Sequence, residues 1–233
     1  MKYFSFLFIS VFLFSCGSEQ APTQTQEEPK AAIDSTEKVP IDEEIVTEKD
    51  EPEIKVDQER LLENLFRFRT EQDLADYYGQ ENISRDFGYS NGGTIKHPVT
   101  LLFPGSDKEL TVKWRNGDST LANPFDIEFV STFSPYWTTF EGVQVGVSLK
   151  ELEELNDSTF WFYGFEWDFG GLSQFESGKL ALLSTRMGLR LKAPEGYSDT
   201  DLLPLIGDKR FNSSNKYAQK LNPVVEFIRL VKG

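Results

Sequence analysis

The feature of this 233-residue chain that most limits its fold is a sharp change of composition near residue 57. Residues 17–57 contain thirteen Asp or Glu, four Lys and no aromatic side chain, which gives a net charge of 4 − 13 = −9. A segment with so little apolar surface and so much charge cannot bury enough to offset its loss of chain entropy. We therefore expect residues 16–57 to be a disordered acidic tether and residues 58–233 to fold.

The part from residue 58 onward is long enough for a single globular domain, which would bury about 70% of the surface of its unfolded chain. The chain has one cysteine, so no internal disulfide can form and packing must hold the domain together. The net charge of the whole chain is −14. This acidity argues against nucleic acid as a partner and against electrostatic binding to anionic membranes.

The segment from Met1 to Ser15 has the pattern of an export signal. Lys2 precedes an almost unbroken apolar run over residues 3–14, which is shorter than the roughly 20 apolar residues of a membrane-spanning helix. The run ends in Leu13-Phe14-Ser15-Cys16, which resembles a lipobox. We expect cleavage before Cys16 and acylation of its side chain; the alternative is ordinary secretion with an incidental cysteine. Gly17, in place of an aspartate, favours the outer membrane, and leaves open whether the domain faces the periplasm or the cell surface.

The globular part resembles itself when Thr70 is aligned with Ser148 and the chain is matched onward without gaps. This suggests two halves, over residues 58–140 and 141–233. The other matched positions are Asp73 and Glu151, Leu74 and Leu152, Tyr77 and Leu155, Phe87 and Phe165, Tyr89 and Trp167, and Gly92-Gly93 and Gly170-Gly171. Thr70 and Ser148 each precede an acidic residue by three positions, as a helix capping box requires. We predict a short helix after each cap.

Alternating or apolar segments predict strands after each helix. The candidates are residues 99–103, 110–114, 125–129, 180–183, 187–191 and 224–231, with a turn at residues 104–107 between the first two. Two short helices on a mostly antiparallel sheet make an α+β fold, and the internal match suggests a tandem helix-plus-hairpin repeat. We interpret Asp199-Thr200-Asp201 as a helix cap before Leu202.

Several strings between residues 70 and 233 carry a resemblance to known proteins. They are Tyr78-Gly79, Leu102-Phe103-Pro104, GVQVGVSLKELE at 142–153 and YGFEWDFGG at 163–171. Together they resemble a group of uncharacterised lipoproteins of the Bacteroidetes. The helix start within 146–152 is also similar to repeats of the β-lactamase-inhibitor-like and outer-membrane-assembly lipoproteins. The second resemblance implies a non-catalytic binding module.

Residues 160–171 contain the densest group of aromatic and acidic side chains. Alternation along one strand would place Trp161, Trp167 and the aromatic residues between and after them on one face, and Glu166 and Asp168 on the other. We expect the aromatic face to be core; the alternative is an exposed surface that stacks sugars or an apolar ridge of a partner. The two carboxylates are either a solvated strand face or a site that accepts hydrogen bonds, holds a cation or acts as acid and base.

The inventory of reactive groups argues against catalysis. His97 is the only histidine and no cysteine beyond Cys16 exists, so neither a multi-histidine metal site nor a cysteine nucleophile is possible. No phosphate-binding loop, dinucleotide fingerprint or nucleophile elbow occurs, and we expect no cofactor.

The sequence as a whole predicts a lipid-anchored, non-catalytic binding or assembly module of the cell envelope, with an envelope protein or a glycan as partner. Its candidate binding residues are Trp161, Trp167, Glu166 and Asp168. The alternative is a small carbohydrate-active hydrolase that uses Glu166 and Asp168 as its carboxylate pair.

The anchor yields the first test. Cys16→Ala removes the acylation site, so the variant is expected in the soluble fraction or with an uncleaved signal, whereas the wild type stays with the membrane. Metabolic labelling with a fatty acid followed by fractionation measures both. A wild-type protein that carries no acyl chain would contradict the lipoprotein prediction.

Overall fold

The computed structural model describes residues 57–90, 93–115 and 126–233. The predicted signal, Cys16, nearly all of the predicted tether, Gly92 of the internal match and Phe125 of a predicted strand lie outside these ranges. Within them, no helix has the length and apolarity needed to cross a membrane.

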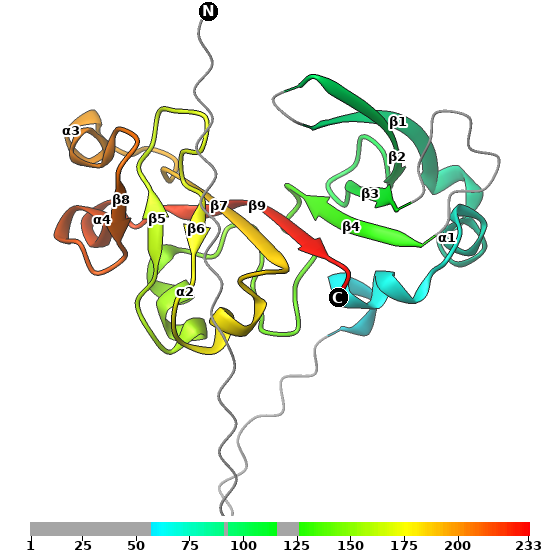
Figure 1. The fold of residues 1–233 in the computed structure, drawn as a ribbon, viewed down its shortest axis with the longest axis horizontal. Coiled ribbons are helices and arrows are strands. Elements are labelled where there is room, and N and C mark those ends of the chain that lie inside the picture. Colours follow the sequence, from blue (N-terminus) through cyan, green and yellow to red (C-terminus); the bar gives the residue numbers. More distant parts are fainter. Residues whose placement is uncertain (1–56, 91–92, 116–125) are drawn as a thin grey trace, which may run out of the picture. The chain divides into compact units, whose positions relative to one another are not determined.

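Two antiparallel sheets form the framework (Figure 1). A six-stranded sheet has the order β1-β2-β3-β4-β9-β7, and a three-stranded sheet has the order β6-β5-β8. The strands are β1 (Ile83–Ser90), β2 (Ile95–Leu102), β3 (Leu110–Trp114), β4 (Ile127–Thr132), β5 (Trp161–Tyr163), β6 (Ser173–Gln174), β7 (Met187–Lys192), β8 (Arg210–Asn212) and β9 (Val224–Val231). With its short helices this is an α+β fold, as the sequence predicted.

Four α-helices and five 3-10 helices accompany the strands in the described ranges. They are α1 (Glu71–Tyr78), α2 (Leu149–Asn156), α3 (Asp199–Leu202), α4 (Lys216–Leu221), η1 (Gln58–Arg60), η2 (Leu62–Arg67), η3 (Gln80–Asn82), η4 (Lys179–Leu183) and η5 (Leu203–Leu205). The two helices predicted from the sequence are α1 and α2.

Both predicted capping boxes are present. At α1 the Thr70 hydroxyl accepts a hydrogen bond from the Asp73 backbone N–H at 3.1 Å, and the Asp73 carboxylate accepts the Thr70 N–H at 2.9 Å. At α2 Ser148 and Glu151 make the same reciprocal pair. Each box satisfies backbone donors that the first turn of a helix leaves without an intrahelical partner.

The order of elements repeats between the two halves. The interval between Thr70 and Ser148 also separates the start of α1 from that of α2, the start of β1 from that of β5, and the start of β2 from that of β6. For β3 and β7 the interval is one position shorter. Each half is thus a capped helix followed by an antiparallel meander, and the second half carries an extra segment, α3 to α4, before its last strand. An isolated antiparallel bridge between Leu172 and Arg190 continues the second meander from β6 to β7.

The last strands of the two halves pair with each other. β4 and β9 are antiparallel, in a register that runs from Phe129 opposite Val231 to Thr132 opposite Ile228. This ladder joins β1 to β4 of the first half with β9 and β7 of the second half in one six-stranded sheet.

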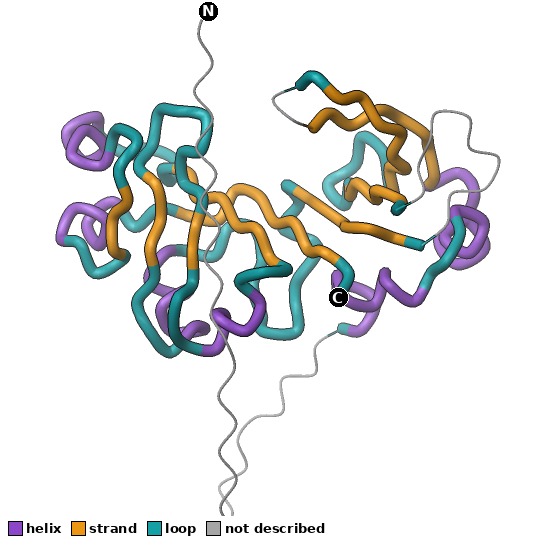
Figure 2. The backbone as a smooth tube through the Cα atoms, in the orientation of Figure 1, coloured by secondary structure: helices purple, strands orange, loops and turns teal. Residues whose placement is uncertain are grey.

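One core fills the space between the sheet and the helices. Leu74 of α1 and Leu152 of α2 belong to the same buried cluster as Val112, Val130 and Ile228 of the large sheet. In Figure 2 the helices η2, α2 and η4 lie on one side of strands β4, β7 and β9.

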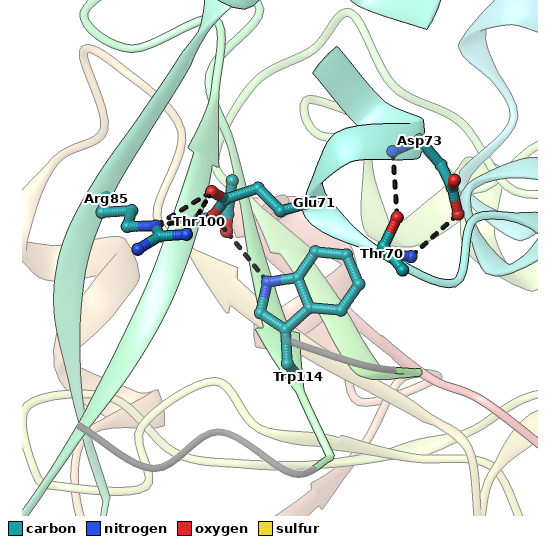
Figure 3. Close-up of polar contacts among 6 residues, drawn as sticks. All are labelled: Thr70, Glu71, Asp73, Arg85, Thr100 and Trp114. Atoms are coloured by element: carbon teal, nitrogen blue, oxygen red, sulfur yellow. Dashed lines mark hydrogen bonds and ion pairs between the residues drawn. The ribbon is translucent and has the colours of Figure 1, made fainter. Parts of the chain in front are cut away.

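A polar network attaches α1 to three strands (Figure 3). The buried Thr100 hydroxyl of β2 donates to the Glu71 carboxylate at 2.6 Å and accepts from the Trp114 indole N–H of β3 at 2.9 Å. Arg85 of β1 closes the network with an ion pair to Glu71 at 2.8 Å. Because each polar atom inside this network has a partner, the buried hydroxyl and indole are accommodated without an unpaired group.

One predicted strand is wrong. Residues 180–183 form part of the 3-10 helix η4 rather than a strand, and period-2 burial is absent from the run. A helix, α3, does begin before Leu202, but Asp199 to Asp201 form its first turn and its N-cap residue is Ser198.

A third prediction, that Ile127 and Phe129 share a strand face, is also wrong. A register shift opposite Lys113 and Trp114 inserts Glu128 as an extra residue, so Ile127 points into the core and Phe129 out of it.

The two caps make a matched test. Thr70→Ala and Ser148→Ala each remove one side-chain acceptor from a helix start, so each should lower the free energy of unfolding by about 0.5–2 kcal/mol. Thr159→Ala, at an exposed position outside the helices, is the control and should change it by less than about 0.5 kcal/mol. Denaturant unfolding measures all three.

The Asp73 cap should also respond to pH. Hydrogen bonds from the backbone N–H groups of Arg69 and Thr70 lower the pKa of Asp73 below its usual 3.8. Its contribution is therefore present at neutral pH and lost as the pH falls through that lowered pKa. Asp73→Asn should lose stability at neutral pH and converge on the wild type in strong acid, as unfolding measured across that pH range would show.

Candidate functional site

The predicted long strand over residues 160–171 is wrong, because β5 ends at Tyr163. Phe160 and Phe162 are buried, with 1% and 0% of their surface exposed, whereas Trp161 and Tyr163 are partly exposed. The predicted faces are therefore reversed within β5: the core side carries the two phenylalanines.

The backbone leaves the strand at Gly164 for a geometric reason. A Cβ atom there would lie 2.5 Å from the carbonyl oxygens of both Leu205 and Gly207, so the residue must be glycine for the chain to approach so closely. Two residues later Glu166 has φ +66°, a conformation that no strand contains. These two features end the alternation on which the prediction depended.

The loop that follows is fixed by backbone hydrogen bonds. The N–H of Phe165 donates to the carbonyl of Leu205 at 2.8 Å, and the N–H of Gly171 donates back to the carbonyl of Tyr163 at 2.9 Å. The N–H of Leu191 in β7 donates to the Gly171 carbonyl at 2.8 Å. The loop is thus attached to the strand before it, to the η5 segment and to the large sheet.

This loop and β5 present four aromatic side chains at the surface, which we call the aromatic row: Trp161, Tyr163, Trp167 and Phe169. The rings of Tyr163 and Trp167 are 5.5 Å apart, and those of Trp167 and Phe169 are 5.2 Å apart, both edge to face. The Trp167 indole N–H donates to the Gly164 carbonyl at 2.8 Å, which fixes its ring. Phe169, at the end of the row, is 58% exposed.

Polar side chains of the neighbouring strands flank the row. The Arg210 guanidinium lies over the Trp161 ring at 5.1 Å, donates to Gln174 at 2.7 Å and pairs with Glu176 at 3.1 Å. The outer face of the small sheet therefore combines flat aromatic rings with hydrogen-bonding groups that are held in place.

The two predicted carboxylates do not both line the cavity beside this loop. Glu166 and Asp168 are both exposed in the loop. Glu166 lines a cavity of about 430 Å³ together with Tyr197 and the ion pair of Arg190 with Glu226, and Asp168 is not among the residues that line it. Acid–base catalysis by a carboxylate pair needs both groups at one reacting bond.

His97 and the acidic residues do not form a metal site in the described part of the chain. His97 lies on β2, where its Nδ1 atom is buried without a hydrogen-bond partner and burial, with Lys113 nearby, lowers its pKa. Within residues 57–90, 93–115 and 126–233, no three His, Cys, Asp or Glu side chains cluster as metal ligands would.

Sequence reasoning missed a second exposed feature, on the face of the large sheet opposite the core. Here cations and rings alternate: Lys113 lies over Phe129 at 5.5 Å, Arg229 lies 4.5 Å from Phe129 and 5.8 Å from Phe227, and a further arginine, Arg190, lies 5.8 Å from Phe227. This ladder exists because the bulge at Glu128 turns Phe129 outward, and nothing in a single segment of sequence signals it.

Comparisons with known proteins add little to this geometry. No family model and no curated protein matches the sequence. A crystal structure of the uncharacterized protein yfeY from Escherichia coli is similar at a TM-score of 0.36 and 12% identity, over 70% of this chain and 88% of that one.

Because the two faces of β5 differ in burial, alanine substitutions at adjacent residues should lower the free energy of unfolding by different amounts. Phe162→Ala should lower the free energy of unfolding by about 3–5 kcal/mol, since it empties a fully buried site. Trp161→Ala, on the exposed side, should cost less than about 2 kcal/mol. Denaturant unfolding of the two variants decides the point, and equal costs would contradict the orientation described.

Proposed function

We propose that this protein is a lipid-anchored, non-catalytic binding module of the cell envelope, and that the aromatic row is its binding surface. The observation that carries the proposal is the row itself. Phe169 is exposed and Trp161, Tyr163 and Trp167 are partly exposed, in a domain that buries other aromatic residues completely, such as Trp114 and Trp137. Exposed apolar groups that are contiguous and ordered are typical of interaction sites.

The row has the properties of a preorganised surface. The rings of Tyr163, Trp167 and Phe169 are held by ring–ring contacts and by the indole hydrogen bond of Trp167, and the loop is bonded to three other segments. Little side-chain entropy remains to be lost when a partner binds, which favours affinity. Flat rings beside an arginine and an amide suit either the apolar face of a glycan or the side chains of an envelope protein.

The arrangement of Glu166 and Asp168 supports binding over hydrolysis. Glu166 lines a cavity that Asp168 does not line, so this cavity holds one carboxylate of the pair that a hydrolase would need. The charge of the chain supports the exclusion of nucleic acid as a partner. Lipidation of Cys16 and a tether that spans about 35 Å as a random coil would hold the domain away from the membrane.

The test uses the mature lipoprotein and its surface tryptophans. Titration with envelope glycans, and separately with solubilised outer-membrane proteins, should change the fluorescence of Trp161 and Trp167 in a saturable way. Trp167→Ala and Phe169→Ala should each weaken that binding at least about tenfold, as central aromatic contacts do. Tyr89→Ala is the control, because Tyr89 is an aromatic residue that is 61% exposed in the other half of the domain.

Two outcomes would overturn the proposal. If both row variants bind as tightly as the wild type, the binding site is not the aromatic row. If the wild type shortens a glycan, and if Glu166→Gln and Asp168→Asn each abolish that activity, the protein is a hydrolase and the proposal is wrong.

A further inference from the structure

A separate cavity of about 370 Å³ lies in the first half of the domain. It is bounded by η1, the end of α1, the turn between β2 and β3, and the segment that follows β4. The residues that line it are Glu59, Tyr77, Tyr78, Phe103, Lys108, Tyr136 and Trp137. We call it the aromatic pocket; its volume is within the range of small-molecule sites.

The walls of the aromatic pocket are held together by their own ring contacts. Tyr78 meets Tyr77 at 4.7 Å and Phe103 at 5.6 Å, in both cases edge to face. Tyr136 meets Trp137 edge to face at 5.2 Å, and Phe103 lies 6.4 Å from Trp137. Because Trp137 is fully buried and its indole N–H donates to the Lys108 carbonyl at 2.8 Å, the rear wall is rigid.

Apart from the Trp137 indole, the polar side-chain groups of the pocket have no hydrogen-bond or ion-pair partner in the described part of the chain. The Lys108 ammonium lies 4.5 Å from the Tyr136 ring and 5.9 Å from the Phe103 ring, and makes neither an ion pair nor a hydrogen bond there. The carboxylate of Glu59 and the hydroxyls of the lining tyrosines are also without hydrogen bonds to described residues. A concave aromatic site with a few polar groups that are open to a ligand has the composition of a ligand site.

Charge selects the class of ligand. Besides Lys108, two arginines lie on the outer rings of the pocket: Arg60 is 5.1 Å from the Tyr136 ring and Arg67 is 4.4 Å from the Tyr77 ring. Among the lining residues, Lys108 is the one cation and Glu59 the one carboxylate, so the two arginines on the outer rings make the surroundings more positive. An anionic group would gain a charge-assisted hydrogen bond from Lys108.

The repeat shows that the scaffold does not need these aromatic residues. When Thr70 is aligned with Ser148, Tyr77 corresponds to Leu155, Tyr78 to Asn156 and Phe103 to Ala181. The same helix-and-meander framework forms in the second half without aromatic walls. The pocket is therefore an addition to the fold rather than a requirement of it.

We infer that the aromatic pocket binds an acidic monosaccharide, a pyranose whose carboxylate pairs with Lys108 and whose ring lies against the aromatic walls. The apolar faces of a sugar ring suit the rings of Tyr136 and Phe103, and its hydroxyls suit the tyrosine hydroxyls and the Glu59 carboxylate. An aromatic carboxylate would pair with Lys108 and contact the walls, but it has no hydroxyls to bond to those polar groups and so forms fewer hydrogen bonds.

The experiment uses the full mature lipoprotein in detergent and three probes: glucuronate, glucose and benzoate. Saturation-transfer NMR gives the affinities. Glucuronate should bind at least about tenfold more tightly than glucose, and more tightly than benzoate, because it alone satisfies both the ammonium and the hydroxyls. Lys108→Met keeps most of the apolar stem and should abolish the preference for glucuronate over glucose. Tyr136→Ala should weaken both sugars.

Matched controls separate this inference from the proposed function. Lys216 also lies over a tyrosine ring, at 4.8 Å from Tyr217, and Lys216→Met should leave glucuronate binding unchanged. Trp167→Ala, in the aromatic row, should also leave it unchanged, so either proposal can fail without the other. The inference is overturned if no sugar binds saturably in the millimolar range, if glucose binds as well as glucuronate, if benzoate binds more tightly, or if the preference survives in Lys108→Met.

Discussion

The rest of the structure depends on the pairing of β4 with β9. Each half of the domain is a short meander with a capped helix. By itself, neither half has enough strands to cover its apolar face and also to pair the free edge of its last strand. The antiparallel ladder from Phe129 opposite Val231 to Thr132 opposite Ile228 removes both exposed edges at once. Val130 and Leu230, paired at its centre, are buried in the common core.

Departures from regular strand geometry decide which side chains reach the surface. The extra residue Glu128 turns Phe129 away from the core, and Gly164 followed by Glu166 at φ +66° ends β5 and starts the loop that carries Trp167. At Glu128 the change exposes a ring that alternation from Ile127 would bury, whereas at Gly164 and Glu166 it buries Phe165, which alternation from Trp161 would leave on the outer side. The irregularities of the backbone therefore help to decide which aromatic rings reach the surface.

The two proposed sites differ in how their rings are brought together. The aromatic row comes from one continuous segment, so its residues are visible as a cluster in the sequence even though their faces were predicted wrongly. The aromatic pocket takes its walls from segments as far apart as Glu59 and Trp137, and no local pattern connects them. Ring–ring contacts within each site leave the side chains little freedom to lose on binding.

The sequence by itself determined the local features: the caps at Thr70 and Ser148, the hairpin of β2 and β3, and the strands β7 and β9. These depend on neighbours a few residues away, through hydrogen bonds of the first helical turn and the period of apolar side chains. Only the tertiary structure decided the pairing of β4 with β9, the bulge at Glu128 and the end of β5 at Gly164. Those outcomes depend on contacts between segments distant in the chain, such as the close approach of Gly164 to Leu205, which no local pattern encodes.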